Sequence, residues 1–261
     1  MGHYKKNFLE HAILRVDFSS QIEKLKEEIN IDVKNKCMEF FPVFETQKIH
    51  KKEISVKNTP EGNPDITNKE TEDTFWNFFN PQRNRQLAIS SNFVHVDYKD
   101  YLDFENFGTP FCEVLTELLR KYPDIKPNRL GLRYVDKIRI PDLKKQGRTW
   151  GSYWKKYIAQ NLLCGINFAD DEGNLSRQMN SIEMNYDEDF MLRFQYGIFN
   201  EDYPATNKRT IFTIDTDIYS MKLFTLEEIR ENIIIFNKKA EQWFEKSIKD
   251  PLREIMGKSE L

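Results

Sequence analysis

The chain has few of the residues on which metal sites and covalent catalysis most often depend. Its 261 residues include only three cysteines, Cys37, Cys112 and Cys164, and four histidines. The cysteines are far apart and form no CxxC pair, so closely spaced zinc ligands are missing. Each cysteine lies among apolar neighbours, which is typical of a reduced, buried thiol. A glycine-rich phosphate loop is also missing. We therefore expect no cofactor.

A strong net charge and long apolar runs are missing too. The formal net charge is −3 although 31% of the residues are charged, so the whole chain is not attracted to nucleic acid or to an acidic membrane. Charged residues interrupt the apolar stretch from Phe8 to Phe18, unlike the core of a signal peptide. No apolar run is long enough to cross a membrane. These features predict a cytoplasmic protein that does not bind membranes.

Large aromatic residues are abundant. The chain has 20 Phe, 11 Tyr and 4 Trp, and aromatic side chains bury much apolar area per residue. The length suits one large domain or two small ones.

Hydrophobic periodicity predicts an α+β fold. In the first half the pattern predicts a strand over Leu9–Phe18, a helix over 20–36, strands over Met38–Gln47 and Ile49–Lys57, an exposed loop over 58–73, a three-stranded antiparallel meander over 75–98, and a helix headed by Thr109 and Pro110. In the second half it predicts a strand over Leu130–Ile140, a short aromatic helix over Thr149–Ile158, strands over Leu162–Phe168, Gln178–Tyr186, Phe190–Phe199 and Arg209–Ile218, and a long final helix capped by Thr225.

The two halves follow one plan, in which a strand, a helix, several antiparallel strands and a second helix succeed one another. We expect units over residues 1–127 and 128–261, related by a pseudo-twofold axis and forming one compact body, with the long C-terminal helix packed on a sheet. Leu14-Arg15-Val16-Asp17 opens the first half, and the similar segment from Leu132 to Asp136 opens the second.

Period-two alternation places four cations, Arg129, Arg133, Lys137 and Arg139, on one side of a strand. Such a face can bind phosphate or an acidic partner. The alternative, which we favour, is a solvated strand face balanced by acidic neighbours, because a half-exposed antiparallel sheet needs polar residues outward.

Asp215 and Asp217 share another strand face. Two carboxylates at this spacing can hold Mg²⁺ together with phosphate oxygens, although no third acidic ligand accompanies them. The favoured alternative is structural, with these carboxylates paired to Arg15 or Arg133 across the sheet.

The aromatic segment contains Trp150, Tyr153, Trp154 and Tyr157 beside several cations. Four aromatic residues on a short helix cannot all face one core, so Trp150 and Trp154 are candidates for contact with a partner or ligand.

Several segments resemble one family of sporadically distributed bacterial and archaeal proteins of about this length. They are the Asn-Phe-Leu start at Asn7, the Arg15/Asp17 strand, the segment from Arg129 to Tyr134, and the Asp215-x-Asp217 strand before the final helix. The family has no established activity, and its pattern has Asn where this chain has Asp136. The patchy distribution implies a component of a mobile element, a phage-defence system or a toxin–antitoxin system.

The absence of catalytic motifs favours a non-enzymatic binding or assembly protein that holds a protein partner or self-associates. One alternative is a metal-dependent nucleotide or phosphodiester enzyme that uses Asp215 and Asp217. The other is nucleic-acid binding through the basic strand face, which is less favoured.

Overall fold

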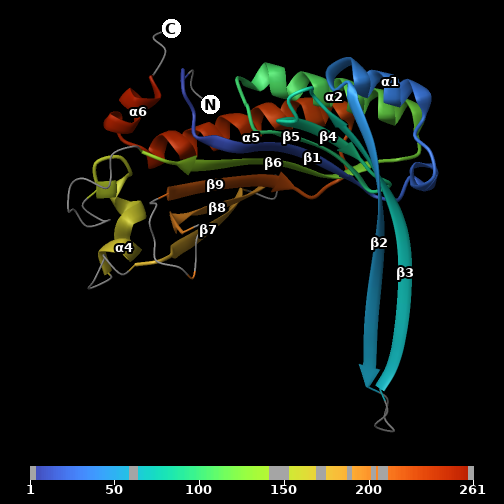
Figure 1. Ribbon diagram of the computed structural model, residues 1–261, viewed down its shortest axis with the longest axis horizontal. Helices are drawn as coiled ribbons and strands as arrows, with labels where there is room; N and C mark the ends of the chain where they lie inside the picture. The colour runs from blue at the N-terminus through green and yellow to red at the C-terminus, as the bar shows by residue number, and fades with distance from the viewer. Residues whose placement is uncertain are drawn as a thin grey trace.

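The computed structural model describes residues 4–58, 64–140, 153–168, 175–186, 190–200, 204 and 211–257. These residues build a nine-stranded antiparallel sheet in the order β2-β3-β4-β5-β1-β6-β9-β8-β7 (Figure 1). The strands are β1 (Leu9–Phe18), β2 (Val43–Asn58), β3 (Pro64–Phe79), β4 (Arg85–Ile89), β5 (Phe93–Tyr98), β6 (Pro127–Ile138), β7 (Gln178–Tyr186), β8 (Phe190–Phe199) and β9 (Ile211–Ser220).

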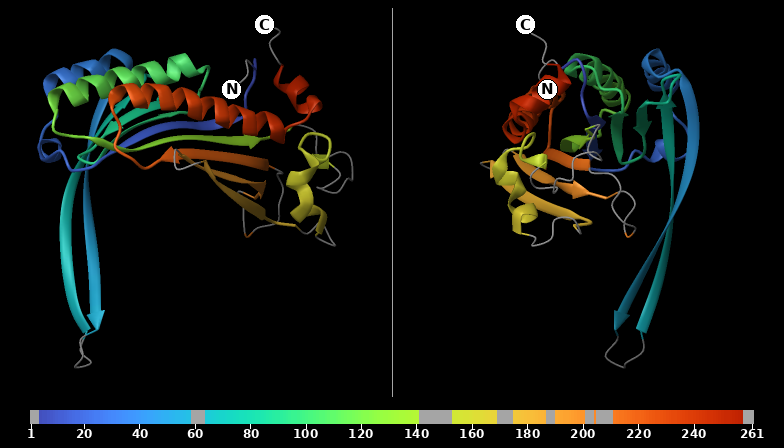
Figure 2. Two further views of the ribbon diagram at one scale, coloured as in Figure 1. Left: turned by 180° about the vertical axis from the view of Figure 1, so that it is seen from behind. Right: turned by 60° about the vertical axis from the view of Figure 1, so that its left-hand side comes forward.

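Helices cover one face of this sheet. The long ones, α1 (Ile31–Phe40), α2 (Phe104–Lys121) and α5 (Leu226–Ser247), lie in a layer on the same side of the strands (Figure 2). The short ones are η1 (Glu23–Lys26), η3 (Gln160–Leu163), α4 (Cys164–Phe168) and α6 (Asp250–Met256). In the described part of the chain, no helix is both long and apolar enough to cross a membrane. The α+β fold with a long C-terminal helix on the sheet is confirmed.

The first strands of the two halves, β1 and β6, pair at the centre of the sheet. Leu14 lies opposite Leu132 in this pair. On one side β1 pairs with β5, and on the other β6 pairs with β9, so the first strand of each half pairs with the last. Along the chain, each half has the predicted order of a strand, helical segments, antiparallel strands and a long helix. The duplication itself stays a prediction, because in the described residues the first half contributes five strands and the second four.

The predictions for the final helices and several strands are confirmed. Thr225 and Glu228 form the expected capping box of α5, whose buried face includes Ile229, Phe236 and Phe244. Helix α6 restarts after Lys249, and Gly257 ends it with a φ of 65°. Strands β1, β7 and β8 have the predicted bounds.

The predicted helix over 20–36 is wrong in position. Residues 23–26 form only the short η1, and α1 begins at Ile31, where the Asn30 side chain accepts a hydrogen bond from the Asp32 N–H. Asn30 therefore provides the cap from which the helix of this segment starts. Because α1 continues to Phe40, Met38 is helical and the strand expected there begins only at Val43.

The exposed loop predicted over 58–73 is wrong from Pro64 on, where β3 begins, and residues 59–63 lie outside the described part of the chain. Strands β2 and β3 pair from Val43 opposite Phe79 to Asn58 opposite Pro64, yet β3 pairs with β4 only over Trp76–Phe79. Residues 48–58 and 64–74 therefore form a two-stranded ribbon, here called the arm, which projects from the sheet away from the helix layer (Figure 1). At about 3.4 Å per residue the arm is about 35 Å long.

Two other boundaries differ from the prediction. Helix α2 begins at Phe104 with Asp103 as its cap, so Pro110 lies inside the helix instead of at its head. The segment 162–168, expected as a strand, is helical in η3 and α4. Short apolar runs of this kind fit either structure, and tertiary packing decides between them. Cys37 is buried as predicted, whereas Cys164 is exposed.

Candidate binding face of the sheet

The sheet face opposite α1, α2 and α5, here called the open face, carries the polar side chains of the central strands. In β1 the alternate residues Ala12, Leu14 and Val16 are buried in the core, whereas Arg15 and Asp17 are only half-buried. Strand β6 alternates in the same way, with Leu130, Leu132 and Tyr134 in the core. Period-two geometry thus puts the charged residues of neighbouring strands on one surface.

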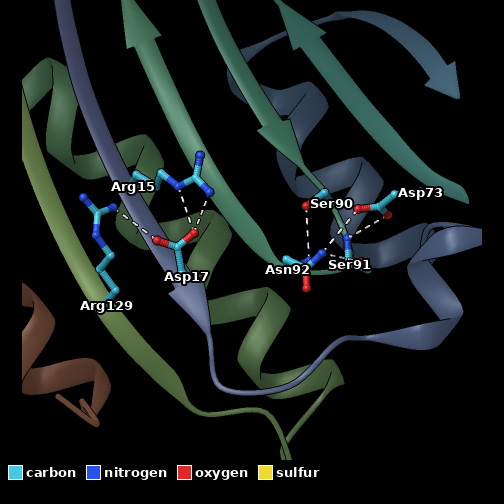
Figure 3. A network of polar contacts seen from close by, with 7 residues as sticks. All are labelled: Arg15, Asp17, Asp73, Ser90, Ser91, Asn92 and Arg129. Carbon is cyan, nitrogen blue, oxygen red and sulfur yellow. Dashed lines mark hydrogen bonds and ion pairs between the residues drawn. The ribbon is translucent and has the colours of Figure 1, made fainter. Parts of the chain in front are cut away.

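Asp17 joins two arginines at the centre of the open face (Figure 3). Its Oδ1 accepts hydrogen bonds from Nε and Nη2 of Arg15 at 2.9 and 2.6 Å. Its Oδ2 accepts one from Nη1 of Arg129 at 3.2 Å. Arg15 precedes Asp17 by two residues on β1, and Arg129 lies opposite Asp17 on β6, so strand register alone brings the three side chains together.

Aromatic rings flank this cluster on both sides. The Arg15 guanidinium lies 4.0 Å from the centre of the Phe93 ring, and Phe93 makes an edge contact with Phe75. The Arg129 guanidinium lies 5.2 Å from the centre of the Tyr219 ring. Cations over aromatic faces are attracted by the ring quadrupole. Both arginines are therefore held by a carboxylate on one side and a ring on the other.

Two further arginines pair with the aspartates of β9. Arg133 donates two hydrogen bonds to Asp215, at 2.8 and 2.6 Å, and Arg193 of β8 donates one to Asp217 at 2.9 Å. Burial raises the pKa of the Asp217 carboxyl above its usual range, although Arg193 acts in the opposite direction. The predicted cross-strand pairing of Asp215 with Arg133 is confirmed. We call the four arginines and three aspartates of these contacts the arginine network: Arg15, Arg129, Arg133, Arg193, Asp17, Asp215 and Asp217.

The arginine network presents its guanidinium groups to the outside. The Arg133 side chain is 42% exposed and its partner Asp215 only 11%, and for Arg193 and Asp217 the values are 42% and 12%. Arg15 and Asp17 differ in the same direction, at 39% and 22%. In these three pairs the arginine side chain is thus more exposed than the carboxylate that it contacts.

The other two predicted cations also have acidic partners. Lys137 lies 2.8 Å from a carboxylate oxygen of Glu10, and Arg139 pairs with the same carboxylate. With Arg129 on Asp17 and Arg133 on Asp215, all four members of the predicted basic strand face are paired. The pairing supports the interpretation of a face balanced by acidic neighbours.

The candidate metal ligands Asp215 and Asp217 are each hydrogen-bonded to an arginine. Among the residues that the structure describes, no group of three or more histidine, cysteine or acidic side chains is placed to hold a metal ion. A Mg²⁺ ion at these two carboxylates would have to displace two guanidinium groups. Both observations therefore speak against a metal site here.

Trp154 is a core residue, so its assignment to a partner or ligand surface is wrong. Its side chain is fully buried, with its ring centre 5.3 Å from that of Phe212. Its Nε1 has no hydrogen-bond partner in the described structure. Trp154 thus packs against β9, and the Tyr153 ring contacts the rings of both Trp154 and Tyr157. The other candidate, Trp150, lies outside the described residues.

A second polar cluster, which the sequence analysis missed, lies at the base of the arm (Figure 3). Asp73 is buried, and its carboxylate accepts hydrogen bonds from the Ser91 N–H at 3.4 Å and the Asn92 side chain at 3.5 Å. Thr74 donates to the Lys26 carbonyl at 2.5 Å. The Asp73 bonds tie β3 to the β4–β5 turn, and the Thr74 bond ties it to η1. The only signal in the sequence was an acidic residue beside the aromatic run that starts at Phe75.

The sequence matches no protein-family model and no curated protein. Its resemblance to the sporadically distributed family therefore stays a prediction.

Proposed function

We propose that this protein is a non-enzymatic binding protein whose open face recognises an acidic surface of a partner protein. The observation that carries the proposal is the difference in exposure within the arginine network, in which each arginine side chain is more exposed than the carboxylate that it contacts. A planar guanidinium offers several donors in a fixed geometry that matches a carboxylate. A partner that presents acidic side chains to this face would find its hydrogen-bond donors already in position.

The aspartates and rings also restrict the arginines before any partner arrives. Arg15 is held between Asp17 and the Phe93 ring, and Arg133 is held by two hydrogen bonds to Asp215. Binding to a flexible arginine normally requires that its side-chain freedom be lost, which weakens affinity. Here much of that freedom is already lost in the folded protein.

Charge balance favours a protein over nucleic acid as the partner. The arginine network sets four cations against three anions, and the whole chain has a net charge of −3. Nucleic-acid binding depends on neutralising many phosphates with an excess of positive charge. A nearly neutral face with local donors suits a partner that alternates acidic and other polar groups. The resemblance implies that such a partner belongs to the same mobile-element, phage-defence or toxin–antitoxin system.

Co-expression with the products of the adjacent genes tests the proposal. We expect one of them to co-purify and to form a complex of defined mass in size-exclusion chromatography with light scattering. The informative variant is Arg133→Gln/Asp215→Asn, which removes both charges but retains a hydrogen-bonding pair. It should weaken the complex at least tenfold.

The matched control is Lys36→Gln/Glu39→Gln, which removes a salt bridge of 2.7 Å on α1, in the helix layer. It should leave the affinity unchanged. A protein that stays monomeric with every adjacent gene product contradicts the proposal. So does a complex that the open-face variant leaves intact, or a salt-dependent shift of duplex DNA or RNA with no protein partner.

A further inference from the structure

A groove of about 850 Å³ lies between α2 and α5 in the helix layer. The two helices run side by side in both views of Figure 2. The groove follows α2 from Leu102, just before the helix, to Glu113, and is bounded on the other side by Arg230, Ile233 and Ile234 of α5. It belongs to the side of the sheet opposite the arginine network, so it is separate from the open face.

Most of the exposed surface that lines the groove is apolar. Leu102 is 71% exposed and Ile234 is 48% exposed, with Phe104 and Ile233 between them in the lining. Gly108 also lines the groove, and a Cβ atom there would make ordinary contacts with the Phe104 ring at 3.6 Å and with Ile233 Cδ1 at 3.9 Å. Adjoining exposed apolar side chains of this size are uncommon on a protein surface unless they meet a partner.

Carboxylates form the rim on the α2 side. Asp103, Glu105 and Glu113 line the groove, against a single cation, Arg230. The Arg230 guanidinium donates a hydrogen bond to Thr116 Oγ1 at 3.1 Å, which directs it to α2. Glu113 is also contacted by Lys36 of α1 at 3.5 Å, but the three carboxylates still outnumber the two cations. The rim would therefore attract lysine or arginine and repel acidic side chains.

The dimensions match a short helix. From Leu102 to Glu113 the groove spans about 16 Å at the helical rise of 1.5 Å per residue, which is about three turns of a second helix lying alongside. A helix whose apolar residues recur at steps of three and four places them all in such a groove, and its flanking positions reach the rim.

We propose that the α2/α5 groove binds an amphipathic α-helix of a partner protein that has leucine-like residues on one face and lysine or arginine on the flanks. The apolar face contacts Leu102, Phe104 and Ile234, and the basic flanks pair with Glu105 and Glu113. This surface does not depend on the proposed role of the open face, because the two lie on opposite sides of the sheet.

The test uses the full-length protein and a fluorescent, helix-stabilised 16-residue peptide with leucines on one face and lysines on both flanks. Fluorescence anisotropy should show saturable binding. A peptide with glutamates in place of the lysines should bind at least tenfold more weakly, as should a scrambled peptide of the same composition. In the variant Glu105→Lys the preference between the lysine and glutamate peptides should fall or reverse.

Ile234→Lys places a charge in the groove at an already exposed position, so it should weaken binding of the lysine peptide at least tenfold without unfolding the protein. The control is Ile255→Lys, at a position on α6 that is 37% exposed and outside the groove; it should leave binding unchanged. Equal binding of the scrambled peptide, no binding of the lysine peptide, or equal effects of the two isoleucine variants overturns the proposal.

Discussion

Arg15 and Arg133 occupy corresponding positions on the two central strands, each one residue beyond the Leu14–Leu132 pair. Both project onto the open face, yet they have different partners: Asp17 and the Phe93 ring for Arg15, and Asp215 for Arg133. The two arginines thus form separate contacts in one layer and do not converge on a common carboxylate. This arrangement suits an extended contact surface better than a single catalytic centre.

Breaking one pair of the arginine network should destabilise the fold. In Arg133→Ala, the Asp215 carboxylate stays mostly buried but loses its two hydrogen bonds. The free energy of unfolding should therefore fall by about 1–3 kcal/mol. Urea unfolding followed by circular dichroism measures this loss. The double variant Arg133→Gln/Asp215→Asn should recover most of it, and a double variant no more stable than Arg133→Ala would contradict the pairing.

Asp136 should make stability depend on pH. Its side chain is buried on the core face, its Oδ1 has no hydrogen-bond partner in the described structure, and burial raises the pKa of its carboxyl well above the ordinary 3.8. Above the pKa of the unfolded state, the folded state retains a proton that the unfolded state releases, so folding is progressively penalised as pH rises.

Asp136→Asn removes this penalty. The variant should be more stable than the wild type at pH 7, and the advantage should shrink as the pH approaches 4, where the carboxyl of the unfolded state also takes up protons. Chemical unfolding at a series of pH values gives the comparison. A difference that stays constant between pH 4 and 7 would show that the carboxyl is not the cause.

The arm should be dispensable for folding, because its two strands pair with each other beyond the four β3 residues that reach β4, Trp76–Phe79. Deleting Lys51–Thr71 and joining His50 to Glu72 through Asn-Gly retains the register of that pair and the Asp73 contacts. We expect a thermal midpoint within a few degrees of the wild type. A deletion variant that fails to fold would mean that the arm contributes to the core.

Trp154 should behave as a core residue. Trp154→Ala removes a fully buried side chain and should lower the free energy of unfolding by about 3–5 kcal/mol. Denaturant unfolding checks this, and a loss of partner binding with unchanged stability would instead support the surface role that the sequence suggested.

The sequence predicted best where a segment buries one face. From Ala12 to Phe18 the burial of β1 alternates because the strand lies beneath helices, and the stripe of α5 has helical spacing because it covers the sheet. The arm escaped prediction because a ribbon outside the core needs no apolar alternation. The charges of β6 and β9 were found by period two, which left Arg15 and Arg133 as alternative partners of the aspartates, and the structure pairs Arg133 with Asp215. Arg193 was missed because only the β8–β9 register places it opposite Asp217.

Arginine-specific labelling tests the central claim most directly. Phenylglyoxal is applied to the protein alone and in complex with its partner, and mass spectrometry gives the extent of modification at each arginine. The open-face account predicts that Arg15, Arg133 and Arg193 are protected in the complex, whereas Arg120 on α2 reacts equally in both samples. Protection of Arg120 with unchanged reactivity at the other three would contradict it.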